Sequence, residues 1–357
     1  MNPIYFDHNA TTPLDPRSLE EMKVYLTTNF GNPSSIHQIG RKARVRLDDY
    51  REKVAKLLKC KSHEIIFTSG GTESNNLALF GVSRMLLRES KRNVVIVSSI
   101  EHHAVLHCAK YLELDGSFQV IYIPVDSDGR VSLKDLKDQL ELNKGRIALV
   151  SIMAANNETG AHQPFTAIGD LCKEHGVLFH TDAAQWIGKE AFDGIQFFSA
   201  DLVSICAHKF NGPKGVGILY AKSPLHPDPI LFGGGHENDR RAGTENLANI
   251  AGMAVALELV TPSPFLNDQR RHQNWINQLR TSIITIPGIK VWTPEKGSLP
   301  NTLMFSFDSQ DAISIIAALD LEGICVSSGS ACSVGSLLPS HVLEAQGASK
   351  QIGRAHV

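Results

Sequence analysis

The chain has 357 residues, of which 42% are hydrophobic and 20% are charged, and its formal net charge is −2 at pH 7. This length is sufficient for two domains with separate cores, and the small net charge gives no reason to expect nucleic acid or an anionic membrane surface as a partner. No apolar run approaches the roughly 18 residues that a membrane-spanning helix requires, and the first residues lack the basic start and apolar core of a signal peptide.

Apolar segments of strand type and helix type alternate through much of the chain. After a short extended start and a Thr-Thr-Pro turn, we expect helices at 16–27 and 39–58. Strands are then predicted at 64–68, 93–98, 119–125, 147–153 and 177–181, and the helices between them at 73–89, 103–114, 133–141 and 165–175. This alternation predicts a largely parallel sheet with helices on both faces.

The next segment, residues 201–217, has the sequence DLVSICAHKFNGPKGVG. Its apolar, β-branched start predicts a buried strand at 202–207, and glycines and a proline then break the chain before a second apolar run at 215–221. Lys209 follows that strand, where partial burial would lower its pKa and free the nitrogen lone pair for attack on an aldehyde. A solvated loop lysine is the alternative interpretation.

After Tyr220 the pattern loosens into a loop rich in Pro, Gly and His, and a helix is predicted at 247–260. The Thr-Pro-Ser-Pro segment at 261–264 indicates a domain boundary. Beyond it we expect helices at 266–284 and 311–321 and strands at 302–307 and 324–326. We therefore predict a large domain over 15–260 and a smaller α/β domain formed by 1–14 and 261–357.

Polar residues of particular types follow the predicted strands, at the edge where open α/β sheets bind their ligands. The sequence SGGTE at 69–73 opens a helix, where glycines and the helix N-terminus suit a phosphate, although Thr72 could simply cap the helix. His102 could stack on a flat ring or move protons. Asp182 could keep a ring nitrogen protonated, or it could cap a turn. Together with Lys209, these are the groups that a pyridoxal phosphate site needs.

The sequence resembles the class V aminotransferases and, within them, the cysteine desulfurases of the NifS/IscS type. The resemblance runs in order from the N-terminus to residue 342 and depends on the whole set of motifs. It implies an α/β protein of fold type I among pyridoxal-phosphate-dependent transferases, with a large domain built on a mainly parallel sheet flanked by helices and a smaller α/β domain. The matching segments are YFDHNATTP (5–13), FGNPS (30–34), FTSGGTESN (67–75), EH (101–102), NNE (156–158), DAAQ (182–185), HK (208–209), GGGHE (233–237), RAGT (241–244) and SSGSAC (327–332).

The resemblance implies a role for each residue at the cofactor ring. Lys209 would bind the aldehyde of pyridoxal 5'-phosphate covalently and carry protons between the substrate Cα and the cofactor. Asp182 would pair with the pyridine nitrogen and Gln185 with the ring hydroxyl. His102 would stack on the ring and assist proton transfer, and Asn157 would lie beside the substrate or the ring hydroxyl.

The other implied contacts concern the phosphate, the substrate and a second subunit. Thr244 is similar to the residue that reaches the partner subunit's phosphate, which implies a homodimer, and Asn32 would contact the substrate, L-cysteine. The residues expected at the phosphate are Gly71, Thr72, Cys206 and His208. The family usually has serine or threonine at the position of Cys206. Because a thiol is a weaker hydrogen-bond donor, we expect looser cofactor binding than in a Cys206→Ser variant.

Cys332 is the residue that the resemblance marks as distinctive of a desulfurase. It is one of six scattered cysteines without a CxxC pair, a pattern that favours reduced thiols in a cytoplasmic protein. Its neighbours are small and polar, which suits an accessible loop, although a free cysteine is more often an inert buried residue. The resemblance implies that its thiolate attacks the sulfur of cofactor-bound cysteine, leaving L-alanine and a persulfide. The sulfur would pass to an acceptor or scaffold protein in iron–sulfur cluster assembly or tRNA thiolation, with Cys332 as a transient iron–sulfur ligand and no resident metal.

The end of the chain is a second departure from the family pattern. The sequence ends at Val357, where the family continues with an arginine-bearing strand and a final helix. That arginine clamps the substrate carboxylate. Arg354 lies close in sequence but does not match the motif position, so we do not assign this role to it. We expect an incomplete sequence that lacks the last elements of the small domain.

Three alternatives stay open. A selenocysteine lyase, or another class V lyase or aminotransferase, would share every cofactor residue and differ at Cys332 and its loop. A catalytically impaired binding or scaffold protein would fit the missing arginine. A metal hydrolase would use His103 and His107, four residues apart on a helix, with His180 and Asp182.

Overall fold

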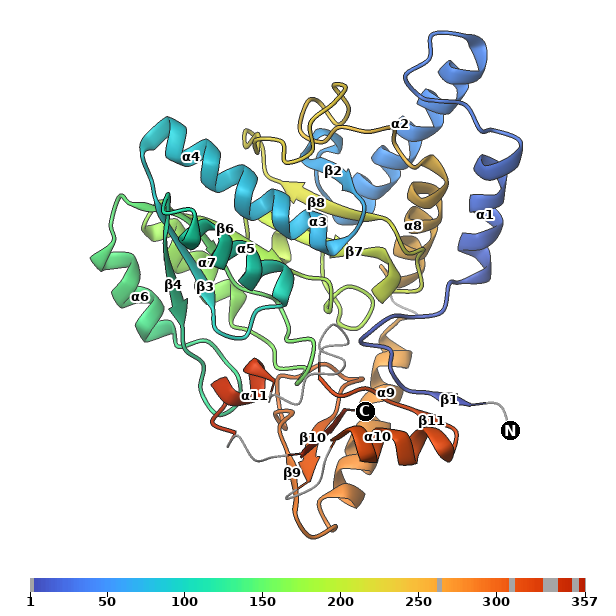
Figure 1. Ribbon diagram of the computed structural model, residues 1–357. Helices are drawn as coiled ribbons and strands as arrows, with labels where there is room; N and C mark the ends of the chain where they lie inside the picture. The colour runs from blue at the N-terminus through green and yellow to red at the C-terminus, as the bar shows by residue number, and fades with distance from the viewer. Residues whose placement is uncertain (1–2, 262–264, 308–311, 330–339, 349–352, 357) are drawn as a thin grey trace.

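The computed structural model describes residues 3–261, 265–307, 312–329, 340–348 and 353–356. Its largest element is a seven-stranded sheet with the strand order β2-β8-β7-β6-β5-β3-β4 (Figure 1). The strands from β7 to β4 are parallel, whereas β8 is antiparallel to both of its neighbours. The predicted, largely parallel sheet is therefore confirmed. The strands are β2 Ile65–Thr68, β3 Val94–Ser98, β4 Gln119–Ile123, β5 Ile147–Ser151, β6 Leu178–Asp182, β7 Leu202–Cys206 and β8 Gly217–Ala221.

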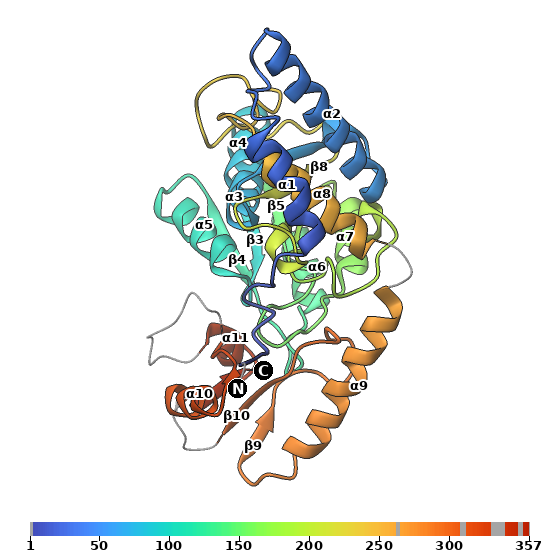
Figure 2. The same cartoon turned by 90° about the vertical axis from the view of Figure 1, so that its right-hand side faces the viewer.

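Helices cover both faces of this sheet and create two apolar layers (Figures 1 and 2). Successive strand residues alternate between the layers: in β3, Val94 and Ile96 belong to one and Val95 and Val97 to the other. Because both faces are buried, the central strands are continuous apolar runs. The first layer contains side chains of α1 Pro16–Thr27, α2 Gln38–Leu58, α6 Leu133–Leu142, α7 Phe165–Glu174 and α8 Leu247–Val260. The second contains side chains of α4 Val82–Ser90 and α5 His103–Leu114.

Several predicted elements have different bounds in the structure, and for two of them the physical reason is clear. The helix expected at 73–89 consists of α3 Gly71–Asn76, a π-type turn at Leu77–Gly81 and then α4. A Cβ on Gly81 would lie 2.6 Å from the carbonyl oxygen of Asp228, so this turn needs a glycine where the two backbones meet. The strand expected at 119–125 stops at Ile123, because Pro124 has no amide hydrogen for the strand ladder.

A smaller group of elements lies below the large sheet in Figure 1. Its central strand, β10 Met304–Phe307, is antiparallel to β9 Ile289–Val291 and β12 Gly353–His356. Side chains of α9 Phe265–Ile283 and α10 Ala312–Leu321 pack together with those of β9 and β10. The start of the chain joins this group, because β1 Ile4–Tyr5 pairs in parallel with β11 Ile324–Cys325. The division into domains at residue 260 stays a prediction.

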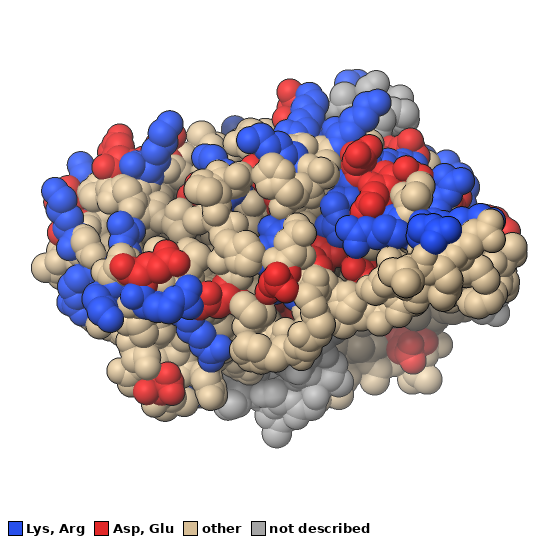
Figure 3. All heavy atoms as spheres, turned by 90° about the horizontal axis from the view of Figure 1, so that it is seen from above, with Lys and Arg blue, Asp and Glu red and all other residues tan. Residues whose placement is uncertain are grey.

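The sequence pattern does not predict β9, β12 or α11 His341–Ala345, since each is short. Arg354 lies in β12, opposite Ser306 of β10, and the expectation that the last elements of the small domain are missing stays a prediction. Within the described ranges, no helix is both long and apolar enough to cross a membrane. On the face shown in Figure 3, Lys and Arg are interspersed with Asp and Glu, in agreement with the small net charge.

Candidate active site

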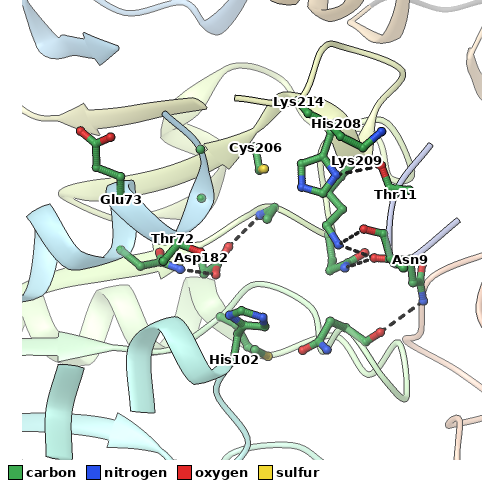
Figure 4. A pocket seen from close by; sticks show the side chains of 18 of the residues that line it. Asn9, Thr11, Thr72, Glu73, His102, Asp182, Cys206, His208, Lys209 and Lys214 are labelled. Atoms are coloured by element: carbon green, nitrogen blue, oxygen red, sulfur yellow. Dashed lines mark hydrogen bonds between the residues drawn. The ribbon is translucent and has the colours of Figure 1, made fainter. Parts of the chain in front are cut away.

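A cavity of about 470 Å³ lies at the carboxyl ends of β6 and β7 (Figure 4). The N-terminal segment at 9–11 lines it from one side, and Ser327 and Gly329 of the smaller group also contribute. Residues far apart in the sequence therefore meet here. The sequence-predicted residues in its lining are Gly71, Thr72, His102, Asn157, Asp182, Gln185, Cys206, His208 and Lys209.

Lys209 ends a short 3-10 turn, Ala207–Lys209, that directly follows β7. Since β7 is parallel to β6, which ends at Asp182, both side chains reach the same edge of the sheet. The Lys209 amine donates to the carbonyl oxygens of Asn9, at 2.5 Å, and Ala10, at 2.9 Å. The lysine is half-buried, so it is not the solvated loop residue of the alternative interpretation.

Asp182 presents a buried carboxylate that is held by neutral donors. Its Oδ2 accepts a hydrogen bond from Asn75 Nδ2 at 2.6 Å, and its Oδ1 accepts from the backbone N–H of Ala184 at 2.9 Å. Asn75 is itself 1% exposed and comes from α3. A buried carboxylate favours a cationic partner. A protonated ring nitrogen in the cavity would supply that charge.

The start of α3 forms one wall of the cavity. Gly70 has a φ of +152°, a conformation that favours glycine, and no atom lies within 4 Å of the position of a Cβ there. A Cβ on Gly71 would lie 3.3 Å from the Cβ of Cys206. The wall thus leaves open space at Gly70, where an anion can approach backbone N–H groups, whereas a side chain at Gly71 would crowd Cys206.

His208 and Cys206 flank this wall as uncharged groups. Burial, aided by the charges of Lys209 and Lys214, lowers the pKa of His208 to about 4. Burial raises the pKa of the Cys206 thiol. Both side chains can therefore donate a hydrogen to an anion at neutral pH, the imidazole strongly and the thiol weakly.

His102 lies across the cavity from Cys206 and His208 in Figure 4. It is the N-cap of α5, and its Nδ1 accepts from the backbone N–H of Ala104 at 3.1 Å. Burial lowers the pKa of His102, while the carboxylate of Asp182 raises it. Because Nδ1 is an acceptor, the neutral ring carries its hydrogen on Nε2.

Two of the predicted site residues that the structure describes, Asn32 and Thr244, do not lie in the lining. Asn32 accepts from the backbone N–H of Ser34 at 2.8 Å in a turn before α2. Thr244 lines a separate hollow with Arg241 and Glu237. Cys332 lies outside the described residues.

Asn9, to which the sequence pattern gives no role, connects the parts of the site. Its carbonyl oxygen accepts from Lys209 Nζ and from Gln185 Nε2, the latter at 3.0 Å. Its side-chain Oδ1 accepts from Lys189 Nζ at 2.8 Å, and its Nδ2 donates to Thr302 Oγ1 at 2.9 Å. Only the motif at 5–13 could have indicated this residue, because the contacts come from segments far apart in the sequence.

The geometry does not favour the metal-hydrolase alternative. Both ring nitrogens of His180 are engaged by hydroxyls, at 2.7 Å to Ser151 Oγ and 2.9 Å to Ser204 Oγ. His103 and His107 stack on each other with ring centroids 4.9 Å apart. Among the described residues, no three His, Cys, Asp or Glu side chains are arranged to hold a metal ion.

Comparison with known proteins gives one consistent result. The family profile described as aminotransferase class-V matches residues 4–353. The cysteine desulfurase IscS of Dictyoglomus turgidum is 45% identical over 347 residues, which cover 96% of this chain and 85% of the relative. The putative cysteine desulfurase IscS 1 of Bacillus subtilis is 43% identical, covering 97% of this chain and 89% of the relative.

Solved structures agree with these sequence comparisons. A NifS-like protein superimposes with a TM-score of 0.87 at 38% identity, over 99% of this chain and 93% of that chain. A structure described as SspA in complex with cysteine superimposes with a TM-score of 0.85 at 32% identity, over 99% and 97% of the two chains. The fold is thus shared along nearly the whole chain.

Proposed function

The chain belongs to the class-V aminotransferase family and to its cysteine desulfurases, and we propose that it removes sulfur from L-cysteine with pyridoxal phosphate bound at Lys209. The observation that carries this proposal is the placement of Lys209 and Asp182 at the ends of adjacent parallel strands in one cavity. An amine for the aldehyde and a carboxylate for the ring nitrogen are the two protein groups that this cofactor requires.

The residues present fit the cofactor at both of its ends. Asp182 is buried among neutral donors and suits a protonated pyridine nitrogen. The wall at Gly70 and Gly71 leaves space in which a phosphate could bind, and a Cβ on Gly71 would reduce that space. When bound, pyridoxal phosphate supplies an electron sink that stabilises negative charge at the substrate Cα.

Each side chain around the ring then has a task. Asp182 keeps the ring nitrogen protonated, and Gln185 donates to the ring oxygen. His102 would stack on the ring and assist proton transfer. Lys209 Nζ takes and returns the proton at the substrate Cα as general base and acid, and Asn157 lies beside the substrate or the ring oxygen.

A second set of residues, namely Gly71, Thr72, Cys206 and His208, would hold the phosphate. Thr244, which lines a separate hollow, would serve the phosphate of a second subunit, as the family resemblance implies. We therefore include a homodimer in the proposal, and a substrate contact by Asn32 stays a prediction.

Cys332 performs the sulfur transfer in this proposal. Its thiolate attacks the substrate sulfur, and the substrate C–S bond breaks as the new S–S bond forms. The carbon skeleton takes up a proton and leaves as L-alanine, so no external oxidant or reductant is needed. The persulfide sulfur then passes to an acceptor or scaffold protein, in iron–sulfur assembly or tRNA thiolation. A cytoplasmic location belongs to the same proposal and is supported by the free thiols of the described cysteines.

The test is alanine release from L-cysteine together with mass spectrometry of the protein. We expect one alanine per sulfur, and one additional sulfur atom on Cys332. Cys332→Ala should abolish persulfide formation and keep the cofactor absorption, whereas Cys325→Ala, in β11, is the matched control and should retain both. Desulfuration of cysteine by Cys332→Ala would contradict the proposal and favour a selenocysteine lyase or a related lyase.

A further inference from the structure

A buried lysine lies directly behind the cofactor-facing residues. Lys189 is in the turn that follows β6, and it is 6% exposed. Its Nζ donates to Asn9 Oδ1 at 2.8 Å and to Gln185 Oε1. Within the described part of the chain, no carboxylate lies within ion-pair distance of this amine. Burying a lysine without a counter-ion costs free energy. The presence of this lysine, and of the two acceptors that hold its amine, therefore calls for a functional explanation.

The backbone holds Lys189 in a fixed relation to Lys209. The preceding residue, Gly188, has a φ of +80°, and a Cβ there would lie 2.5 Å from the Cβ of Phe210. Phe210 follows Lys209 directly and is buried. The turn is thus pressed against the segment that carries the catalytic amine, and only glycine permits this approach.

The two contacts of Gln185 define the orientation of its amide. Gln185 Nε2 donates to the backbone carbonyl of Asn9 at 3.0 Å, and a carbonyl can only accept. Gln185 Oε1 therefore points the other way, where it accepts from Lys189 Nζ. An amide carries two N–H donors, and with one on Asn9 the second would be available to a ring oxygen of the cofactor.

We propose that Lys189 is a positioning residue that orients the Gln185 amide, so that the cofactor oxygen meets an N–H donor and never the amide oxygen. Asn9, which lies beside Lys209 in Figure 4, joins the two lysines by accepting from one with its carbonyl and from the other with its side chain. This inference rests on the proposed cofactor site and adds a residue that does not touch the cofactor.

The titratable groups around Lys189 are compatible with its role in orienting the Gln185 amide. Burial, and secondarily the charge of Lys209, lowers the pKa of Lys189 well below the usual value for lysine. The other titratable groups that face it are His208 and His8. An amine donates hydrogens in its charged and its neutral form, so the orientation of Gln185 does not depend on the charge of Lys189.

Lys189→Met tests the inference, because it keeps the apolar part of the side chain and removes the donor. We expect the dissociation constant of pyridoxal phosphate to rise about 3- to 10-fold, the range for one lost hydrogen bond. An N–H donor stabilises the deprotonated ring oxygen. The pH midpoint of the bound cofactor's visible absorption should therefore rise. Lys222→Met, at an exposed lysine, is the matched control and should leave both values unchanged.

A double-mutant cycle with Gln185→Ala separates positioning from a general structural effect. If Lys189 acts through Gln185, adding Lys189→Met to the Gln185→Ala protein should not move the midpoint further. Additive shifts, or a wild-type midpoint in Lys189→Met, would overturn the inference. Lys189→Leu, which also lacks a hydrogen-bond donor, carries the same comparison if the methionine variant does not fold. A wild-type protein that binds no pyridoxal phosphate would instead overturn the proposed function.

Discussion

Asn75 provides the sharpest test of how the site holds its carboxylate. Its Nδ2 donates to Asp182 Oδ2 at 2.6 Å, and both residues are buried. Asn75→Ala removes this donor and leaves the carboxylate with the backbone N–H of Ala184. The Asp182 carboxylate then loses one of the two hydrogen bonds that orient it toward the ring nitrogen. We expect weaker binding of pyridoxal phosphate to the variant.

The size of the effect follows from the type of bond. A hydrogen bond to a charged group contributes roughly 1.5–3 kcal/mol, which corresponds to about 10- to 150-fold in an equilibrium constant. Part of this loss also destabilises the protein without cofactor, so we expect the dissociation constant to rise about 10-fold. Asn75→Asp should be more severe, because two carboxylates at this distance cannot both stay ionised.

The assay is titration of the cofactor-free protein with pyridoxal phosphate, followed by visible absorption. Asn76→Ala is the matched control, since Asn76 is the next residue of α3 and donates to the helix carbonyl of Thr72 at 2.7 Å. Its dissociation constant should stay close to that of the wild type. Equal constants for Asn75→Ala and the wild type would refute the reasoning about Asp182.

The other predictions concern the cradle and a buried acid. Cys206→Ser should bind pyridoxal phosphate about 2- to 10-fold more tightly, since a hydroxyl is the better donor; equal dissociation constants would contradict this. Gly71→Ala should bind the cofactor several-fold more weakly, because its Cβ would crowd Cys206 at 3.3 Å, and unchanged affinity would argue against the cradle. Burial raises the pKa of Glu101 to about 8 from 4.5. Between these two pH values the folded protein retains a proton that the unfolded chain loses, so the free energy of unfolding falls as the pH rises. Glu101→Gln should gain in Tm relative to the wild type as the pH rises, and a constant difference would contradict the assignment.

The fold and the central pair of the site could be predicted because both depend on local patterns. Strands buried on two faces leave continuous apolar runs, and parallel strands end at one edge of the sheet. Lys209 and Asp182 stand at two such ends, so their meeting follows from the alternation of elements. The short strands β9 and β12 have too few residues for a periodic signal, and the sequence pattern misses them.

The supporting residues could not be predicted, because their contacts depend on tertiary packing. Asn9 meets Gln185, Lys189 and Thr302 only after the N-terminal segment crosses the edge of the large sheet. Lys189 has the local sequence of an exposed turn lysine, and its burial arises from the approach of Gly188 to Phe210.

The most direct test of the central claim is the site of covalent attachment of pyridoxal phosphate. The purified protein, supplied with the cofactor, is reduced with borohydride, digested and analysed by mass spectrometry. We predict a yellow protein that loses its colour on reduction and carries the pyridoxyl group on Lys209. A protein that stays colourless, or a label on Lys189 or Lys214, would contradict the account.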